Sequence, residues 1–182
     1  MNAITEWDLS VLRAIEGIRN DVLTFIMKFF TYMGDKGILW ISLCILLIAI
    51  PKTRKIGIYA AAALAFQFIL GEGLLKHLIC RDRPFAFDDS INTIITRPTT
   101  YSFPSGHTSS SMAVSFSVFF QNKKLGAPLV LIAFMIAFSR LYFMVHFPTD
   151  IIGGFVLGLS AAIAVFFILN YYFKKRANKK TA

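Results

Sequence analysis

Charged side chains are scarce in this sequence. They make up 16% of its 182 residues, and hydrophobic residues make up 56%, whereas an ordinary soluble domain is roughly 25% charged. This balance excludes a typical soluble enzyme and predicts an integral membrane protein. Because a helix needs about 20 residues to cross a bilayer, the length allows one membrane domain over residues 1–182 and almost nothing outside the bilayer.

Cysteine and acidic residues are also few. The 2 cysteines cannot form the disulfide framework of a small secreted protein. The 10 acidic residues leave a net charge of +9 against 19 Lys and Arg, which in a soluble protein would suggest a nucleic-acid partner. Most of those basic residues instead lie in three short clusters at the ends of apolar runs, so we expect no nucleic-acid binding. The clusters fall within 52–55, 123–124 and 174–180.

Apolar runs with helical spacing predict an all-α fold, an integral membrane six-helix bundle. Residues 4–18 keep their apolar side chains mostly on one side, which is typical of an amphipathic helix at the membrane interface. Charged residues in this segment predict that it is not cleaved as a signal peptide. The transmembrane bundle is predicted over 20–175. Its six helices are expected at 22–33, 38–50, 56–79, 105–121, 126–145 and 149–173.

The three basic clusters also predict an orientation. They follow the second predicted helix, separate the fourth from the fifth and close the sixth, so all three fall on one face, which the positive-inside rule makes cytoplasmic. The stretch 81–104, rich in Pro, Asp, Thr and Arg, then becomes an extracytoplasmic loop. We therefore expect a multi-pass protein of the plasma membrane whose basic tail, 174–182, is cytoplasmic.

Three groups of polar residues lie at the outward ends of these predicted helices. Lys76 and Arg83 are seven positions apart, so on a continued helix both would project from one side and attract an anion. Ser105, Gly106 and His107 open an apolar helix. There a hydroxyl, free backbone N–H groups and an imidazole can face a phosphate, although an ordinary helix N-cap explains the Ser-Gly turn equally well.

The third group is Arg140, His146 and Asp150. The carboxylate follows the second histidine by four residues, which suits a hydrogen bond that holds the imidazole in one tautomer. Together the three groups supply three cations for a phosphoryl group, two histidines for a nucleophile and an acid, and an orienting carboxylate. Because no cluster of carboxylates or histidines offers metal ligands, we predict neither a metal nor a cofactor.

The runs Lys76-x6-Arg83-Pro84, Pro104-Ser105-Gly106-His107 and Ser139-Arg140-x5-His146-x3-Asp150 resemble the three-part signature of the type 2 phosphatidic acid phosphatase family, in its order and spacing. The resemblance implies that His146 is the nucleophile that forms a phosphohistidine. It further implies that Asp150 orients His146 and that His107 protonates the leaving group. The residues that it assigns to phosphate binding are Lys76, Arg83, Ser105, Gly106 and Arg140.

Glu72 is not part of that signature. It precedes Lys76 by four residues, which suits an intrahelical ion pair that pre-positions the lysine. A carboxylate that faces a lipid headgroup, or that stays protonated, is the alternative interpretation.

These residues predict a metal-independent membrane phosphatase whose partners are the bilayer and a phosphorylated membrane lipid. Undecaprenyl diphosphate is the preferred substrate because it arrives phosphorylated at the outer leaflet. Phosphatidylglycerol phosphate or phosphatidic acid is the alternative within the same class. An alternative of another class is a membrane protein that binds or translocates a lipid phosphate without cleaving it. The sequence does not indicate an oligomeric state.

Overall fold

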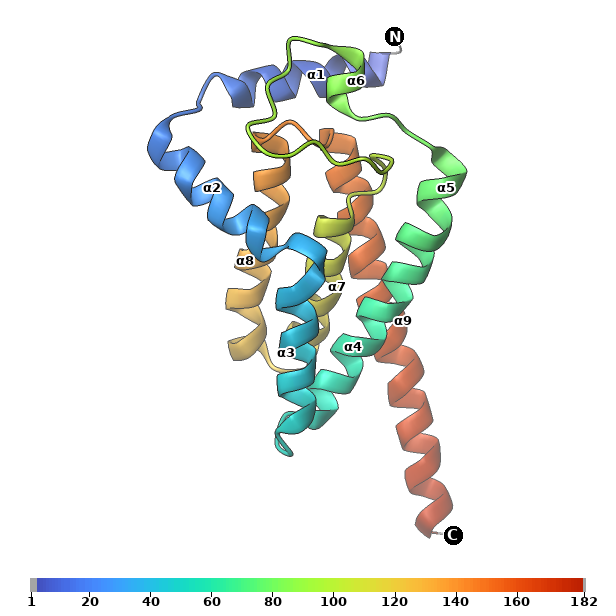
Figure 1. Ribbon diagram of the computed structural model, residues 1–182. Coiled ribbons are helices and arrows are strands. Elements are labelled where there is room, and N and C mark those ends of the chain that lie inside the picture. Colours follow the sequence, from blue (N-terminus) through green and yellow to red (C-terminus); the bar gives the residue numbers. More distant parts are fainter. Residues whose placement is uncertain (1–2, 182) are drawn as a thin grey trace.

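The computed structural model describes residues 3–181, and within this range the chain is helical with no β-strand (Figure 1). The predicted all-α class is confirmed. Residues 1, 2 and 182 of the predicted domain and tail lie outside the described residues. The elements are α1 (Ala3–Glu16), α2 (Asp21–Met33), the 3-10 turn η1 (Asp35–Gly37), α3 (Ile38–Ala49), α4 (Arg54–Phe68), the π-helix η2 (Ile69–Leu75), α5 (Lys76–Ile79), α6 (Pro84–Phe87), α7 (Gly106–Gln121), α8 (Lys123–Tyr142) and α9 (Pro148–Thr181).

Side-chain caps set the start of three of these helices. The side-chain oxygens of Asn20, Ser105 and Asn122 each accept the backbone N–H three positions later, at the beginning of α2, α7 and α8. Such a cap satisfies one of the four N–H groups that a helix leaves without an internal partner. The ends of the predicted helices lie within a few residues of the observed ones, except that α9 continues eight residues past the predicted end at 173 and that the predicted helix 56–79 is divided into α4, η2 and α5.

Helix α7 is the centre of the bundle. Most of its residues are buried, and it packs against α4, α8 and α9. Glycines on its neighbours allow this close approach, because a Cβ at Gly126, Gly154 or Gly158 would overlap atoms of α7 or of the Ser105 cap before it. The bundle thereby places the first turn of α7, which carries His107, among the other helix ends.

The predicted count of six spanning helices is not confirmed. Helices α2 and α3 run in the same direction, one after the other, with a bend of 45° between them (Figure 1). Among the described residues, three helices are long and apolar enough to cross a membrane, or four if the bent pair is one span. The bend lies at η1, where Lys36 and Gly37 have positive φ angles of 54° and 67°. Separate apolar runs thus do not always mean separate crossings.

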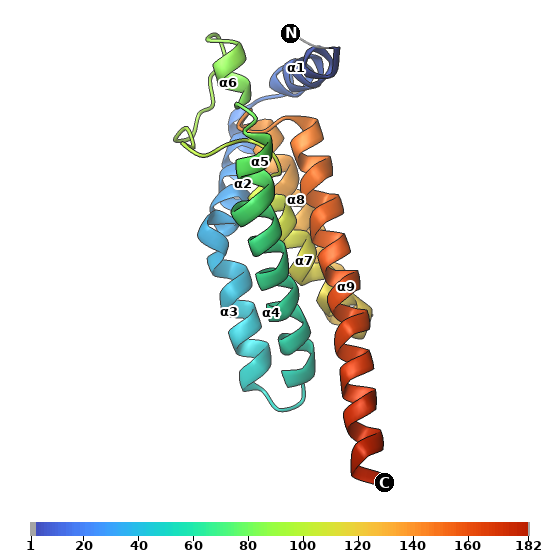
Figure 2. The same ribbon diagram turned by 90° about the vertical axis from the view of Figure 1, so that its right-hand side faces the viewer.

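The basic clusters and the long loop lie at opposite ends of the bundle. The turn between α3 and α4, the turn between α7 and α8, and the end of α9 all lie at the lower end in both views, whereas residues 88–105 lie at the upper end (Figures 1 and 2). The predicted tail continues α9 as far as Thr181. This arrangement gives the molecule one basic end and one loop-bearing end.

Helix α1 lies across the loop-bearing end, roughly perpendicular to the bundle (Figure 1). It contacts α8 and α9, and it buries Asp8 and Leu12 while leaving Ile4 and Trp7 exposed. The amphipathic pattern therefore does form a helix over the bundle end, and its location at a membrane interface stays a prediction.

Candidate active site

Lys76 and Arg83 lie on either side of a break in the chain. Helix α5 ends at Ile79, and Cys80 then takes a left-handed conformation with φ of 48°. Arg83 is extended, with φ of −88° and ψ of 160°, as expected for a residue that precedes proline. The expectation of one continued helix through Lys76 and Arg83 is therefore wrong. Both side chains nevertheless line the same cavity.

The predicted ion pair between Glu72 and Lys76 is confirmed. Nζ of Lys76 donates to both carboxylate oxygens of Glu72, at 2.7 and 2.9 Å. The Lys76 side chain is 7% exposed and that of Glu72 is 31% exposed. Gly106 makes room for the pair, because a Cβ there would overlap Oε1 of Glu72. The ammonium group is thus held beside the first turn of α7.

Arg83 is buried and fixed by backbone carbonyls. Its Nε donates to the carbonyl of Thr100 at 2.7 Å, and its Nη1 donates to the carbonyl of Val145 at 2.7 Å. The same Nη1 lies 3.3 Å from Nε2 of His146. Because a guanidinium can only donate, Nε2 accepts in this contact and carries its lone pair toward the cation.

The other ring nitrogen of His146 faces Asp150. Nδ1 lies 3.3 Å from Oδ2 of the carboxylate, which also accepts the hydroxyl of Ser102 and, at 2.8 Å, the N–H of Phe147. Both side chains of the pair are buried. Burial lowers the pKa of His146 and keeps the imidazole neutral. The pair therefore presents a proton on Nδ1 and a lone pair on Nε2.

Sequence reasoning missed the next layer behind this pair. Arg81 donates to Oδ1 of Asp150 and to Oδ2 of Asp8, both at 2.7 Å, and its guanidinium lies 4.1 Å from the ring centre of Phe147. Asp8 also accepts the backbone N–H and the hydroxyl of Thr149, at 3.0 and 2.6 Å. Asp8 thus connects α1 with the aspartate of the third motif.

The residues at the start of α7 have two different roles, one in holding the helix and one in lining the site. The hydroxyl of Ser105 caps the helix, as the alternative interpretation predicts, and the N–H of Ser105 donates to the carbonyl of Asp150 at 3.1 Å. Gly106 and His107 line the cavity instead. Their backbone N–H groups belong to the first turn, where a helix has no internal acceptors to offer.

His107 has an aspartate partner of its own, which sequence reasoning also missed. Nε2 of His107 lies 2.9 Å from Oδ1 of Asp35, in the turn between α2 and α3. Gly34 brings that turn against the imidazole, because a Cβ at Gly34 would overlap the ring. The histidine side chain is 20% exposed and the carboxylate is 46% exposed. This pair is therefore open to the cavity.

Arg140 is buried with spare hydrogen-bonding capacity. Its Nη1 donates to the hydroxyl of Thr31 at 2.5 Å, whereas its Nε, although buried, has no partner within the part of the chain that the structure describes. An orphaned donor on a buried cation costs free energy unless an acceptor occupies the site. The guanidinium is therefore suited to an incoming anion.

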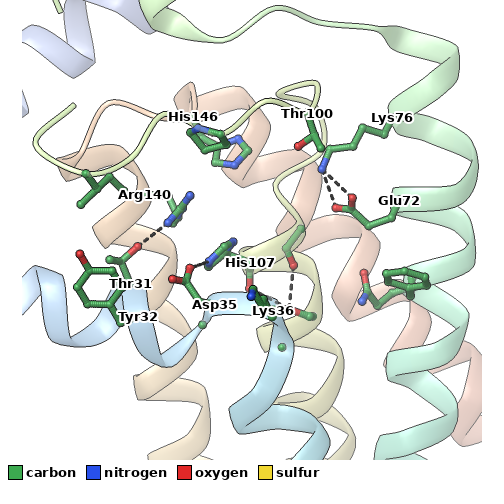
Figure 3. A pocket seen from close by; sticks show the side chains of 18 of the residues that line it. Thr31, Tyr32, Asp35, Lys36, Glu72, Lys76, Thr100, His107, Arg140 and His146 are labelled. Atoms are coloured by element: carbon green, nitrogen blue, oxygen red, sulfur yellow. Dashed lines mark hydrogen bonds and ion pairs between the residues drawn. The ribbon is translucent and has the colours of Figure 1, made fainter. Parts of the chain in front are cut away.

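These groups converge on one cavity of about 870 Å³ (Figure 3). Seven of the nine predicted site residues line it: Glu72, Lys76, Arg83, Gly106, His107, Arg140 and His146. Ser105 and Asp150 are buried behind them, where they support α7 and His146. The three motifs thus meet in space, with three cations and two imidazoles around a common volume.

Metal ligands do not gather in the same way. Between residues 3 and 181, no group of three or more His, Cys, Asp or Glu side chains is placed to hold a metal ion. Positive charge in the cavity comes from lysine and arginine side chains, which bind phosphate oxygens directly. Metal independence stays a prediction.

Comparison with known proteins agrees with this geometry. The chain is 30% identical to undecaprenyl-diphosphatase BcrC of Bacillus subtilis (strain 168), covering 86% of this chain and 81% of that protein. Its fold is similar to that of a transmembrane PAP2 type phosphatidylglycerolphosphate phosphatase from Bacillus subtilis, with a TM-score of 0.78 and 27% identity, covering 94% of this chain and 88% of that chain. It is also similar to Aquifex aeolicus LpxE, with a TM-score of 0.76, 28% identity and coverage of 87% and 93%.

The family model of the PAP2 superfamily matches residues 56–175. That range holds all three motifs and most of the cavity. The resemblance to the type 2 phosphatidic acid phosphatases is therefore confirmed, and this membrane protein belongs to the PAP2 superfamily.

Proposed function

We propose that this protein is a metal-independent membrane phosphatase that hydrolyses a lipid diphosphate, with undecaprenyl diphosphate as its substrate. One observation carries the proposal. The acceptor nitrogen of His146 lies 3.3 Å from Arg83 in a cavity that also holds Lys76 and Arg140. A nucleophile beside three cations is what attack on a phosphoryl group requires. The diphosphate preference is supported by the likeness to BcrC.

In the first step, Nε2 of His146 attacks the terminal phosphorus. The bond from that phosphorus to the bridging oxygen breaks, its electron pair stays on the oxygen, and His107 donates a proton to it. Lipid monophosphate leaves and a phosphohistidine remains. In the second step, water attacks the phosphohistidine, His107 accepts a proton from the water, and inorganic phosphate leaves. Asp150 holds Nδ1 of His146 and stabilises the positive charge on the ring.

The phosphate is bound by the cations of the cavity and by the first turn of α7. Arg83 and Arg140 offer guanidinium donors, and Lys76 adds a point charge. Gly106 and His107 line the same cavity at the positive end of the α7 dipole, where the first N–H groups of a helix have no internal acceptor. Ser105 contributes by capping that helix.

The site faces the extracytoplasmic side of the plasma membrane in this proposal. All three basic clusters lie at the end of the bundle opposite the long loop and α1 (Figure 2), and the positive-inside rule makes that basic end cytoplasmic. With α2 and α3 as one bent crossing, and with the shorter α7 added to the long apolar helices α4, α8 and α9, the chain crosses the bilayer five times and α2 starts on the outer side. Helix α1 then lies in the outer interface, with Ile4 and Trp7 toward the lipid.

A substrate panel tests the activity. The purified protein in EDTA is expected to release phosphate from undecaprenyl diphosphate faster than from phosphatidylglycerol phosphate or phosphatidic acid. His146→Ala is expected to release none. Loss of activity on adding chelator would contradict metal independence, and phosphate release by His146→Ala would contradict the phosphohistidine.

Phosphatidylglycerol phosphate is the second candidate substrate, because a solved structure similar to this one is a phosphatidylglycerolphosphate phosphatase. Phosphatidic acid belongs to the same alternative. A protein that only binds or translocates lipid phosphates needs the cations but not the two imidazoles. Binding of all three lipids without phosphate release would favour that function.

Orientation has a separate test. Ser90 lies in the long loop and is exposed. A cysteine introduced there, in a background with both natural cysteines replaced, is expected to react in intact cells with a reagent that does not cross membranes. Labelling only after lysis would place the loop and the cavity on the cytoplasmic side.

A further inference from the structure

The cavity has a polar end and an apolar end. Its lining includes Ile41 on α3 and Leu64 and Phe68 on α4. Phe68 and Leu64 precede Lys76 by eight and twelve residues along one continuous helical path through η2, so they lie farther from the loop-bearing end than Lys76 does. A lipid phosphate bound beside His146 can therefore extend its hydrocarbon chain between α3 and α4.

Lys36 lies in the turn that precedes α3, five residues before Ile41 of the apolar lining. In Figure 3, His146 and Arg140 lie above His107 and Asp35, and Lys36 lies beside Asp35, at the turn where α3 begins. Lys36 lines the cavity. The residue is exposed, and its charge acts on the neighbouring carboxylate of Asp35, but no hydrogen bond or ion pair fixes its ammonium group among residues 3–181. Besides the three cations of the motifs and Arg97, which donates to the carbonyl of Ile91, the cavity therefore contains Lys36 as a further cation.

The backbone conformation at this turn is unfavourable in free energy. Lys36 has a φ of 54° and Gly37 has a φ of 67°. Glycine adopts such angles freely, whereas a lysine there costs free energy. Strain of this kind collects at binding sites, where the surrounding structure holds a side chain in a useful place. The turn that brings Asp35 to His107 thus also brings Lys36 into the cavity.

We infer that Lys36 binds the second phosphate of a diphosphate substrate, the one that remains on the lipid. The inference rests on the proposed function. When the terminal phosphorus is attacked at His146, the bridging oxygen lies toward His107 and the second phosphate lies beyond it, toward the apolar end. That phosphate carries its own negative charge and gains more as the bond to the bridging oxygen breaks. Lys36 provides the countercharge at this position.

A monophosphate lipid makes a different demand. Its leaving group is an alcohol, which carries no second phosphate for Lys36 to bind. The three cations of the motifs hold the phosphoryl group in both kinds of substrate. Lys36 is therefore a specificity residue that favours diphosphates over monophosphates.

The test compares two substrates in two variants. Lys36→Gln is expected to lower kcat/KM for undecaprenyl diphosphate by roughly 10- to 100-fold, the range for one lost hydrogen bond to a charged group. Its kcat/KM for phosphatidic acid is expected to stay within about 2-fold, which also shows that the variant folds. Lys36→Arg keeps the charge and is expected to keep the diphosphate preference. Lys52→Gln, at the other end of the bundle, is the control for loss of a surface lysine.

Three results would overturn the inference. They are an equal loss on both substrates, no loss on either, and a Lys36→Arg variant as impaired on the diphosphate as Lys36→Gln. Failure of the proposed function looks different, because the unaltered protein would then cleave phosphatidic acid but not undecaprenyl diphosphate.

Discussion

His146 and His107 are each hydrogen-bonded to an aspartate, and the two pairs differ in burial and in the origin of their members. Asp150 follows His146 by four residues, and both side chains are buried. Asp35 precedes His107 by 72 residues, and its carboxylate is 46% exposed. The nucleophile thus has a sealed, local partner, whereas the acid has a distant partner at the edge of the cavity.

This difference follows from what each imidazole has to do. A nucleophile needs one tautomer and one orientation throughout, and a buried carboxylate of fixed geometry provides both. A proton donor has to reach the leaving group and exchange protons with water, so its partner has to remain accessible. We therefore expect burial to decide how much each carboxylate contributes to catalysis.

Asp150→Asn is expected to give the largest loss among the carboxylate variants. The amide keeps the shape but can hold the wrong tautomer of His146, and such a change in a comparable triad costs about 10⁴-fold in kcat. We expect a loss of roughly 10³- to 10⁴-fold in kcat with little change in KM, measured by steady-state phosphate release. A loss below about 10-fold would show that the sealed pair is not what activates His146.

Asp35→Asn is expected to cost about 10²-fold in kcat, at the lower end of what general acid catalysis contributes. His107 keeps its place on α7, so only its orientation and proton affinity change. The loss is expected to shrink for a substrate with a better leaving group, such as a nitrophenyl phosphate. An equal loss on both kinds of substrate would mean that Asp35 does not act through the acid.

Asp8→Asn tests the effect of burial on its own, because Asp8 is buried but distant in sequence from the site. Asp8 is as buried as Asp150, yet it lies on α1 and reaches Asp150 through Arg81 and through the neighbouring Thr149. We expect a loss of roughly 10-fold in kcat, because the Arg81 guanidinium loses one of its two carboxylate partners and small displacements at a site are costly. Glu6→Gln, an exposed change on the same helix, serves as the control.

These predictions also show how much of the candidate site the sequence reveals. His146, Asp150, Lys76, Arg83 and Arg140 are visible because each motif keeps its members close along the chain, and a helix repeat or a short loop then fixes their geometry. The apolar runs similarly predict the helices. Within the motifs, only the continued helix from Lys76 to Arg83 is wrong, because Cys80 takes a left-handed conformation.

The groups that the sequence does not reveal come from distant segments. Asp35 and Thr31 reach the cavity through the bend between α2 and α3, and that bend depends on two positive φ angles which apolar periodicity does not report. Asp8 left one weak signal, since it lies four residues before Leu12 on the apolar side of its helix. Only the packing of α1 on the bundle gives that position a partner.

Glu72→Gln tests a carboxylate that is close in sequence to its partner but partly exposed, the opposite of Asp8. Glu72 lies four residues from its partner, as Asp150 does, but it is 31% exposed. We expect a decrease of only about 3-fold in kcat/KM, because Lys76 keeps its place on the helix while its ammonium group loses a fixed partner. Glu16→Gln, an equally exposed carboxylate paired with Arg13 outside the cavity, is expected to change nothing. A loss as large as that of Asp150→Asn would show that closeness in sequence outweighs burial.

The smallest expected effect is a displacement of the pH profile. Burial lowers the pKa of His146 below its ordinary value, and the hydrogen bond to Asp150 partly opposes this. Because only the neutral imidazole attacks, the acid limb of kcat/KM is expected below pH 6.5, the ordinary value for histidine. Asp150→Asn removes the opposing contribution, so the acid limb of its residual activity moves to still lower pH.

Asp35→Asn is the control and leaves that limb in place. The unaltered protein and both variants are measured with the same substrate, so ionisation of the substrate phosphate affects all three profiles equally. An acid limb that moves in Asp35→Asn but not in Asp150→Asn would assign the titration to His107 and reverse the roles of the two pairs.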